Sequence, residues 1–221
     1  MTSLAAVLWD MDGTLVDSEP LWIDAETELV GSFGQTWTRD DGMTLVGKDM
    51  SVTAAVLQSR GVDLTVTEIK QWLSGAVATR IRQRPLWRPG ARTLLEDLAR
   101  NHVPMALVTS SPRVVADAVM ALVDGAPFSV SIALEDVREP KPSPEPYLRA
   151  AVLLETEISA CVALEDSPSG LRAAVASGAV TVAVPHVVAL PLHAGATIWT
   201  TLEGRSTRDL ADLVVASHAD A

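Results

Sequence analysis

Cysteine is almost absent from this chain of 221 residues, in which Cys161 is the only one. A single cysteine excludes an intrachain disulfide. Cys161 stands in the apolar run ACVALE, where we expect a small buried hydrophobe rather than a catalytic thiol. This cysteine usage fits a reducing cytoplasm.

Positive charge is also scarce, and the formal net charge is -11 at pH 7. No basic stripe could neutralise phosphates, so we expect no nucleic-acid partner. An anionic membrane surface is disfavoured for the same reason. A small anionic substrate is compatible with this charge only if a local cation overrides the overall field.

Long uninterrupted apolar runs are missing as well. The longest apolar region, residues 179–199, is broken by prolines and histidines, so no membrane span is expected. The first residues, MTSLAAVLWDMDG, have no basic region, and their short apolar stretch ends in acid. We therefore expect no signal peptide and a cytoplasmic location.

Short apolar runs alternate with helical patterns in the second half of the chain. The alternation predicts an α/β fold, a doubly wound parallel sheet with helices on both faces. Ser-Pro pairs at the helix starts, and glycines at their ends, are typical cap signals. The predicted strands are residues 7–9, 104–111, 128–134, 160–167 and 179–184, and the predicted helices between them are 111–125, 143–156 and 167–178.

Residues 17–86 differ from the rest, because three segments are helical in pattern and none is a strong strand. This block follows the first strand directly, and the strand-helix alternation resumes near residue 87. The pattern predicts a helical insertion after the first strand. A closing helix is expected over residues 206–219.

Polar side chains gather where the predicted strands end. The first strand runs into DMDGT, a later one ends in Thr109-Ser110-Ser111, and another ends in Glu165-Asp166-Ser167. Ligands of doubly wound sheets bind outside the carboxyl ends of the strands, so these groups and Lys141 should share one rim. Crowded carboxylates repel each other, and Mg²⁺ held by Asp10, Asp166 and Glu165 would offset that repulsion.

Simpler interpretations exist for single segments. DMDG is not a calcium loop, because Leu15 and Leu21 occupy the positions that need glycine and an acid. Taken alone, Lys141 also fits a solvated lysine, and the run from Thr109 to Pro112 fits a plain helix cap. For Asp17 and Ser18 we expect a capping role.

Together these segments resemble the four motifs of the haloacid dehalogenase-like (HAD) hydrolases, in order: DMDGT, the apolar run ending in Thr109, Lys141 in EPKPSPEPY, and ALEDSPSG. The insertion is similar to the small helical cap of the subgroup that contains phosphoglycolate phosphatases, sugar phosphatases and β-phosphoglucomutases. The resemblance implies a Rossmann-like HAD core of residues 1–16 and 87–221 and a helical cap of residues 17–86.

The resemblance also implies a role for each matching residue. Asp10 would be the nucleophile that forms an aspartyl-phosphate. Asp12 would be the general acid and then the base, with its backbone carbonyl on the metal. Thr109 would hydrogen-bond the phosphoryl group, and Lys141 would offset its charge and that of Asp10. Asp166 would hold Mg²⁺.

Further members of the site follow from the same resemblance. Glu165 would be another metal ligand, and Gly13 and Ser110 would complete the phosphate-binding set, with Gly13 letting the backbone approach closely. The implied enzyme is a Mg²⁺-dependent phosphatase of a small phosphorylated metabolite, as a monomer or homodimer.

Two other functions stay open. Phosphomutases of this subgroup carry a histidine on the first cap helix, whereas DSEPLWIDAE has none and Trp22 stands near that place. This difference favours hydrolysis. A catalytically silent HAD-fold binding protein is the other alternative, but it would need no acid at Asp12.

The cap should set specificity and close over the site on a hinge at about residues 15–18 and 84–89. The candidate substrate contacts are Trp22, Lys48, Arg80 and Arg82. Their alternatives are cap core for Trp22, a solvent-facing turn for Lys48, and a solvated helix face for the two arginines.

Overall fold

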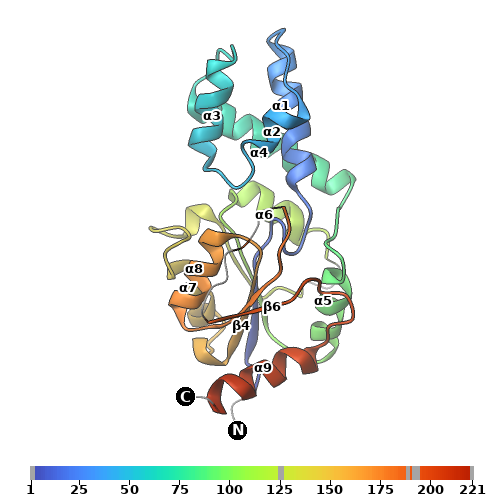
Figure 1. The fold of residues 1–221 in the computed structure, drawn as a ribbon, viewed down its shortest axis with the longest axis vertical. Helices are drawn as coiled ribbons and strands as arrows, with labels where there is room; N and C mark the ends of the chain where they lie inside the picture. Colours follow the sequence, from blue (N-terminus) through green and yellow to red (C-terminus); the bar gives the residue numbers. More distant parts are fainter. Residues whose placement is uncertain (1–2, 124–126, 188–189, 191–194, 220–221) are drawn as a thin grey trace.

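The computed structural model describes residues 3–123, 127–187, 190 and 195–219. Within these residues, parallel strands form one sheet in the order β3-β2-β1-β4-β5-β6 (Figure 1). The strands are β1 (Ala6–Trp9), β2 (Met105–Val108), β3 (Val130–Ile132), β4 (Cys161–Glu165), β5 (Val180–Ala183) and β6 (Ala196–Ile198). The predicted doubly wound α/β fold is confirmed, and the edge strand β6 was not predicted.

Alternation along the strands divides the core into two layers. Val7 and Trp9 of β1 join one buried cluster, and Ala6 and Leu8 join the other. The first layer is completed by α5 (Ala91–Arg100), α6 (Arg113–Met120) and α9 (Thr207–Ala219), and the second by α7 (Glu145–Leu153) and α8 (Pro168–Ser177). Both faces of the central strands are therefore buried.

The cap signals at the helix starts have mixed outcomes. Ser167 caps α8, because its side chain accepts a hydrogen bond from the Gly170 amide at 3.0 Å, and Gly178 ends the helix with a φ of 86°. At α6 the expected cap by Ser111 is wrong, because Pro112 is the N-cap and the Arg113 amide donates instead to Glu135 Oε2 at 2.8 Å. The predicted stop at Gly125 lies outside the described residues.

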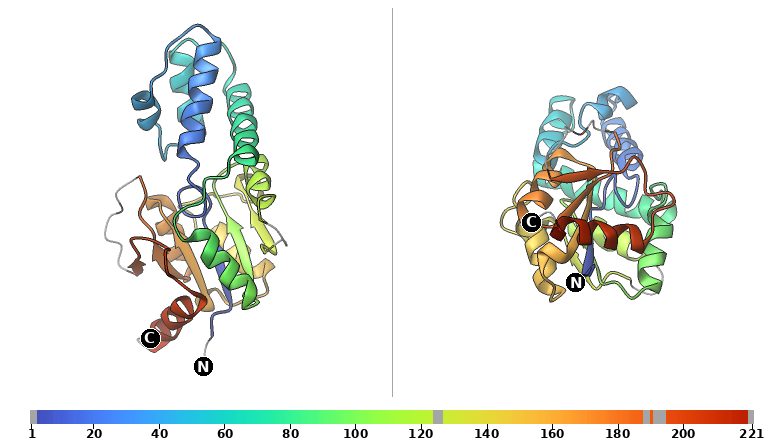
Figure 2. Two further views of the ribbon diagram at one scale, coloured as in Figure 1. Left: turned by 90° about the vertical axis from the view of Figure 1, so that its right-hand side faces the viewer. Right: turned by 60° about the horizontal axis from the view of Figure 1, so that its bottom comes forward.

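The insertion after β1 is helical, and it lies over the carboxyl ends of the strands (Figures 1 and 2). Its helices are α1 (Glu19–Ser32), α2 (Arg39–Met43), α3 (Met50–Ser59) and α4 (Val66–Gln83). The short α2 was not predicted. The division into a core of residues 1–16 and 87–221 and a cap of residues 17–86 stays a prediction. None of the described helices is long and apolar enough to cross a membrane.

Two chain segments connect the insertion to the sheet, and they run side by side. The Asp17 amide donates to the Leu86 carbonyl at 2.6 Å, and the Arg88 amide donates to the Leu15 carbonyl at 3.0 Å. Val16 and Trp87 form an antiparallel bridge between them. The predicted hinge segments are thus one hydrogen-bonded ribbon.

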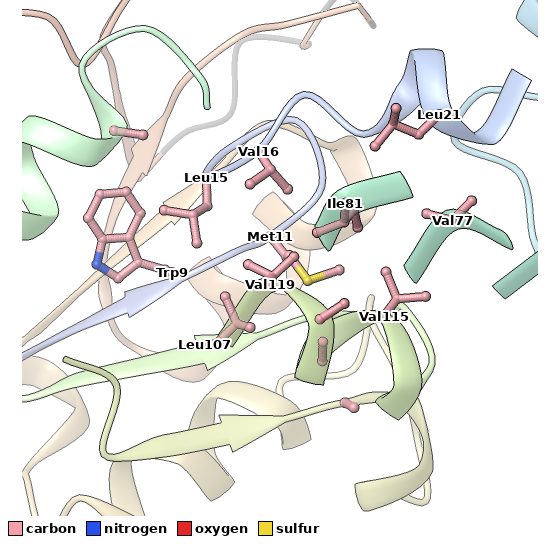
Figure 3. Close-up of a cluster of buried hydrophobic side chains, with 14 of the residues drawn as sticks. Trp9, Met11, Leu15, Val16, Leu21, Val77, Ile81, Leu107, Val115 and Val119 are labelled. Carbon is pink, nitrogen blue, oxygen red and sulfur yellow. The ribbon is translucent and has the colours of Figure 1, made fainter. Parts of the chain in front are cut away.

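An apolar contact joins the insertion to the core beside this ribbon. Val77 and Ile81 of α4 lie in one buried cluster with Val115 and Val119 of α6 and with Met11 (Figure 3). Burial of such side chains is worth about 1.5–3 kcal/mol each. This contact anchors the second half of α4 on the core. Residues of α1, of the loop before α3 and of the first half of α4 line the site.

Candidate active site

A pocket of about 450 Å³ lies between the carboxyl ends of the strands and the insertion. Strand β1 stands between β2 and β4, so the chain turns to opposite sides of the sheet there, the place where doubly wound folds bind ligands. The floor of the pocket contains the polar residues predicted from the strand ends. These are Asp10, Asp12, Thr109, Ser110, Lys141 and Asp166.

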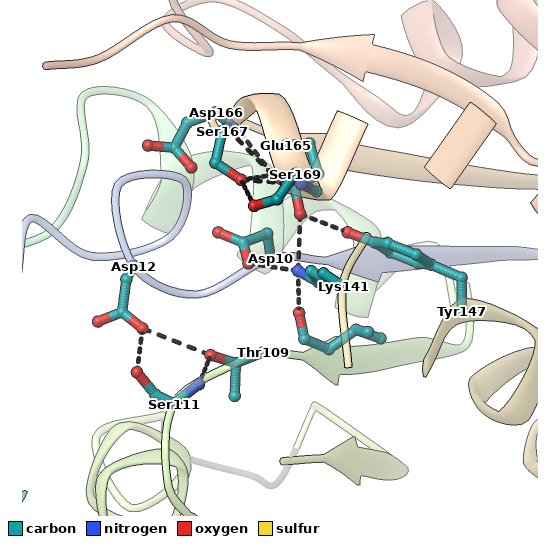
Figure 4. A network of polar contacts seen from close by, with 12 residues as sticks. Asp10, Asp12, Thr109, Ser111, Lys141, Tyr147, Glu165, Asp166, Ser167 and Ser169 are labelled. Atoms are coloured by element: carbon teal, nitrogen blue, oxygen red, sulfur yellow. Dashed lines mark hydrogen bonds and ion pairs between the residues drawn. The ribbon is translucent and has the colours of Figure 1, made fainter. Parts of the chain in front are cut away.

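Lys141 is buried at the bottom of this site. Its Nζ donates to Asp10 Oδ1 at 2.6 Å, to Glu165 Oε1 at 2.6 Å and to the Val108 carbonyl at 2.9 Å (Figure 4). Its side chain is 3% exposed, so the alternative of a solvated lysine is wrong. Burial alone would lower the pKa of Lys141, but the Asp10 and Glu165 carboxylates outweigh it and raise that pKa. Lys141 therefore stays charged and fixes one oxygen of Asp10.

Glu165 lies beneath the site, and both its oxygens are occupied. Oε1 accepts from Lys141 and from the Tyr147 hydroxyl at 2.8 Å. Oε2 accepts from the Asp166 amide and from the amide and hydroxyl of Ser167. A Cβ at Gly170 would overlap this carboxylate, so α8 needs a glycine there to begin so close to it. Direct metal binding by Glu165 would displace some of these hydrogen bonds.

Asp10, Glu165 and Asp166 form the acidic cluster predicted for a metal, since one ligand atom from each lies within 4.8 Å of the others. Three carboxylates face one ammonium group, which leaves an excess of negative charge. Burial and then the charge of Glu165 raise the pKa of Asp10 to about 8, against the effect of Lys141. Burial, Asp10 and Glu165 raise the pKa of Asp166 to about 9. Carboxylate oxygens with such a charge excess fit a hard divalent cation.

Asp12 points to the other side of the pocket floor. Its carboxylate accepts hydrogen bonds from the hydroxyl groups of Ser18, Ser111 (2.6 Å) and Thr109 (3.4 Å). These donors come from two separate segments, the one that precedes α1 and the one that follows β2, so the carboxylate is held in one orientation. Figure 4 shows its contacts with Thr109 and Ser111. The plain helix cap expected as an alternative for Thr109 to Pro112 is therefore wrong.

The turn after β1 needs glycine at position 13. Gly13 has a φ of 84°, and a Cβ there would overlap the Asp166 carboxylate. The glycine thus brings the DMDGT loop against the segment that follows β4. Its predicted contact with phosphate stays a prediction.

The expected capping by Ser18 and Asp17 is wrong. Ser18 is the N-cap of α1 by position, but its side chain makes no cap and bonds Asp12 instead. Asp17 Oδ1 lies 3.6 Å from His186 Nε2.

The structure separates the four predicted substrate contacts into two pairs. Trp22 and Lys48 line the pocket, and Trp22 also packs against the apolar core of the insertion. Arg80 forms an ion pair with Glu28 and lines a separate surface hollow, and Arg82 is exposed on α4. Neither arginine lines the described pocket, so the structure does not support them as substrate contacts.

Several residues of the site were missed. Tyr147 lies beneath the pocket and Ser111 lines it, and both are apparent only from their contacts with Glu165 and Asp12. Lys70 of α4 also lines the pocket, and its Nζ donates to Ser51 Oγ at 2.7 Å. Glu19 begins α1 inside the pocket, where burial, with Asp12 and Asp17, raises its pKa to about 7 against Arg88. The signal in the sequence that could have identified Glu19 was its position close to three other acids, Asp10, Asp12 and Asp17.

The chain matches a family model for haloacid dehalogenase-like hydrolases over residues 7–184. It is 28% identical over 177 residues to a phosphorylated carbohydrates phosphatase of Thermotoga maritima, covering 79% of this chain and 82% of that protein. It is 28% identical over 194 residues to hexitol phosphatase B of Escherichia coli, covering 82% and 84%. A bifunctional riboflavin kinase/FMN phosphatase of Arabidopsis thaliana is 28% identical over 189 residues, and the chain spans about half of it (49%).

The solved structure of CbbY from Rhodobacter sphaeroides in complex with phosphate has the same fold. It superposes with a TM-score of 0.82 at 26% identity, covering 95% of this chain and 99% of that one. The chain belongs to the haloacid dehalogenase-like hydrolase family, and the enzyme class predicted from its sequence, a phosphoric monoester hydrolase, is confirmed.

Proposed function

We propose that the chain is a Mg²⁺-dependent phosphatase that hydrolyses a small organic phosphate monoester, such as a sugar phosphate, through an aspartyl-phosphate on Asp10. The observation that carries this proposal is the pairing of Asp10 Oδ1 with the buried Lys141 beside a separately held second carboxylate, Asp12. In this proposal, Asp10 is oriented to attack phosphorus and Asp12 is oriented to transfer a proton.

In the first step an Asp10 oxygen forms a bond to phosphorus while the bond from phosphorus to the ester oxygen breaks. Asp12 gives its proton to that leaving oxygen, a contribution of about 10²–10⁴-fold in rate. In the second step a water molecule attacks phosphorus, Asp12 takes its proton, and the Asp10 carboxylate is released with inorganic phosphate.

Charge must be compensated throughout these steps. Mg²⁺ held by Asp10, Asp166 and the Asp12 carbonyl would screen the phosphoryl oxygens. Thr109, Ser110 and the amides beside Gly13 would hydrogen-bond the same oxygens. Glu165 as a further metal ligand stays a prediction, and its existing contacts support a role in holding Lys141.

Hydrolysis is preferred to phosphomutation because no histidine lines the described pocket, where Trp22 stands on the first turn of α1. Phosphomutases of the resembling subgroup carry a histidine near that place. A cytoplasmic location and a monomeric or homodimeric state remain predictions from the sequence.

A turnover screen over phosphorylated sugars, polyols, glycolate and nucleotides tests the proposed function. We expect release of inorganic phosphate from at least one of them, and its loss in Asp10→Asn with the fold intact by circular dichroism. Isomerisation of a hexose phosphate that depends on a bisphosphate would support a mutase instead. No turnover across the panel would support a binding protein.

Lys48 is the proposed contact for the part of the substrate far from the ester. Lys48→Ala should lower kcat/KM strongly for the best substrate and barely change it for acetyl phosphate. Arg80→Ala is the matched control, because Arg80 pairs with Glu28 outside the pocket. Equal losses for the two substrates would show that Lys48 does not set specificity.

A further inference from the structure

The wall of the pocket formed by α1 extends well beyond the catalytic floor. Glu19, Trp22, Ile23 and Glu26 all line the pocket, and their spacing places them on one face of the helix. A helix rises about 1.5 Å per residue, so Glu26 lies about 10 Å along α1 from Glu19. Because α1 leads away from the sheet (Figure 1), Glu26 lies farther from the strand ends than Glu19 does.

Glu26 is a buried acid with an incomplete set of partners. It is 5% exposed, and its Oε2 accepts a hydrogen bond from Trp37 Nε1 at 3.2 Å. Gly42 of α2 packs so closely that a Cβ there would lie 3.1 Å from Oε2. Within the described residues, Oε1 accepts no hydrogen bond and no cation pairs with Glu26. Oε1 is not fully buried, and Glu26 lines the pocket, so a ligand there can reach this oxygen.

A structural role explains only half of this arrangement. The buried indole of Trp37 needs an acceptor, and a neutral glutamine would serve it without a charge. Burial raises the pKa of Glu26 to about 7, although the Trp37 hydrogen bond opposes the shift. An unused oxygen of a mostly buried carboxyl group that lines a pocket can accept a hydrogen bond from a donor on a ligand.

The surroundings indicate which kind of donor fits. Lys48 and Lys70 line the same pocket, so a ligand ammonium group would meet two like charges. A hydroxyl group meets no such repulsion. Thr53 is 5% exposed and also lines the pocket, which adds a second hydroxyl-compatible side chain.

We propose that Glu26 is a specificity-determining residue that accepts a hydrogen bond from a substrate hydroxyl far from the phosphate ester. The inference rests on the proposed function, because it assumes that the phosphate lies at Asp10. It deepens that function by naming a residue that selects substrates by their length and by a hydroxyl group far from the ester. The substrate class is a polyhydroxylated phosphate monoester long enough to reach the second turn of α1, and a glycerol-sized phosphate is too short.

Binding of three phosphonates, which are not hydrolysed, tests the proposal by calorimetry in the presence of Mg²⁺. The first is a long polyhydroxylated alkyl phosphonate, the second is a plain alkyl phosphonate of the same length, and the third is a short dihydroxylated one. The variant is Glu26→Gln, which keeps side-chain size and an acceptor for Trp37. Glu28→Gln on the same helix is the matched control, because Glu28 lines the separate hollow.

At about pH 8.5, where Glu26 is ionised, we expect Glu26→Gln to bind the long polyhydroxylated phosphonate about tenfold more weakly, the difference between a charged and a neutral acceptor. The other two probes should change less than about twofold, and Glu28→Gln should match the wild type. Equal weakening of all probes, or no preference of the wild type for the long polyhydroxylated probe, would overturn the proposal. So would stronger wild-type binding of a terminal amino phosphonate that is lost in Glu26→Gln.

The kinetics of the corresponding phosphate monoesters separate this inference from the proposed function. If the wild type hydrolyses none of them, the phosphatase proposal fails, while the binding comparison still decides the role of Glu26. If all are hydrolysed and Glu26→Gln leaves their relative kcat/KM values unchanged, the inference about Glu26 fails alone.

Discussion

Replacing Glu26 by glutamine should remove a pH-dependent loss of stability. Glu26 ionises with a pKa of 4.5 when unperturbed, and burial raises this pKa to about 7 in the folded protein, against the Trp37 hydrogen bond. As the pH rises, the unfolded state therefore releases the Glu26 proton at a lower pH than the folded state does. The stability from this site is complete below pH 4.5, is lost as the pH rises towards about 7, and is constant above that.

The size of the effect follows from the distance between the two pKa values. The interval from 4.5 to about 7 corresponds to about 3 kcal/mol of unfolding free energy. Between about pH 5.5 and 8.5 the wild type should lose about 2 kcal/mol through Glu26, and the glutamine variant should lose none. Among the described residues no charged side chain contributes to the raised pKa of Glu26, so Glu26 titrates as a single independent group.

Urea unfolding at several pH values and constant ionic strength measures the effect as the difference between variant and wild type. Contributions from Glu19 and from the catalytic carboxylates are common to both proteins and cancel. Glu28→Gln should follow the wild type, because the Glu28 side chain is 60% exposed. Parallel curves for Glu26→Gln and wild type would refute a buried Glu26 with a raised pKa.

Two further outcomes concern the catalytic floor. A chelator should abolish turnover and Mg²⁺ should restore it, because the carboxylates of Asp10 and Asp166 lie close together and need a cation between them. Ca²⁺ should inhibit turnover, because its looser coordination misplaces the nucleophile. Full activity in excess chelator would contradict the metal site. Asp12→Ala should slow the first step by about 10²–10⁴-fold for poor leaving groups and much less for good ones, as measured by single-turnover kinetics. An equal loss for all leaving groups would contradict the role of Asp12 as the acid.

The parts of the fold that were predictable are those with a local signal. Nearly continuous apolar runs identified β1, β2, β4 and β5, because strands buried on both faces consist mostly of apolar residues. The edge strand β6 has no such run, since two of its three residues are exposed. The five-residue α2 is too short for a helical period to be visible.

The candidate site was predictable where a strand end places a side chain. Asp10 follows β1, Thr109 follows β2 and Glu165 ends β4, so the topology alone brings them together. Side-chain contacts between elements that are far apart in the chain could not be predicted from the sequence. Arg80 pairs with Glu28 across two helices, and the capping serine expected at residue 18 turns to Asp12 instead. In the sequence, Glu26 has no feature that distinguishes it from other helix residues. Its burial results from contacts with Trp37 and Gly42, which the sequence does not indicate.

The most direct test of the proposed mechanism is to trap the phosphoryl group on the protein. Asp12→Asn should slow release of the aspartyl-phosphate, because no base then activates the attacking water. Acid quenching during turnover, followed by peptide mass spectrometry, should show one added phosphoryl group on the peptide that contains Asp10, located at Asp10 by fragmentation. Phosphate release without any phosphorylated protein in a single turnover, or a phosphoryl group on a different residue, would contradict Asp10 as the nucleophile.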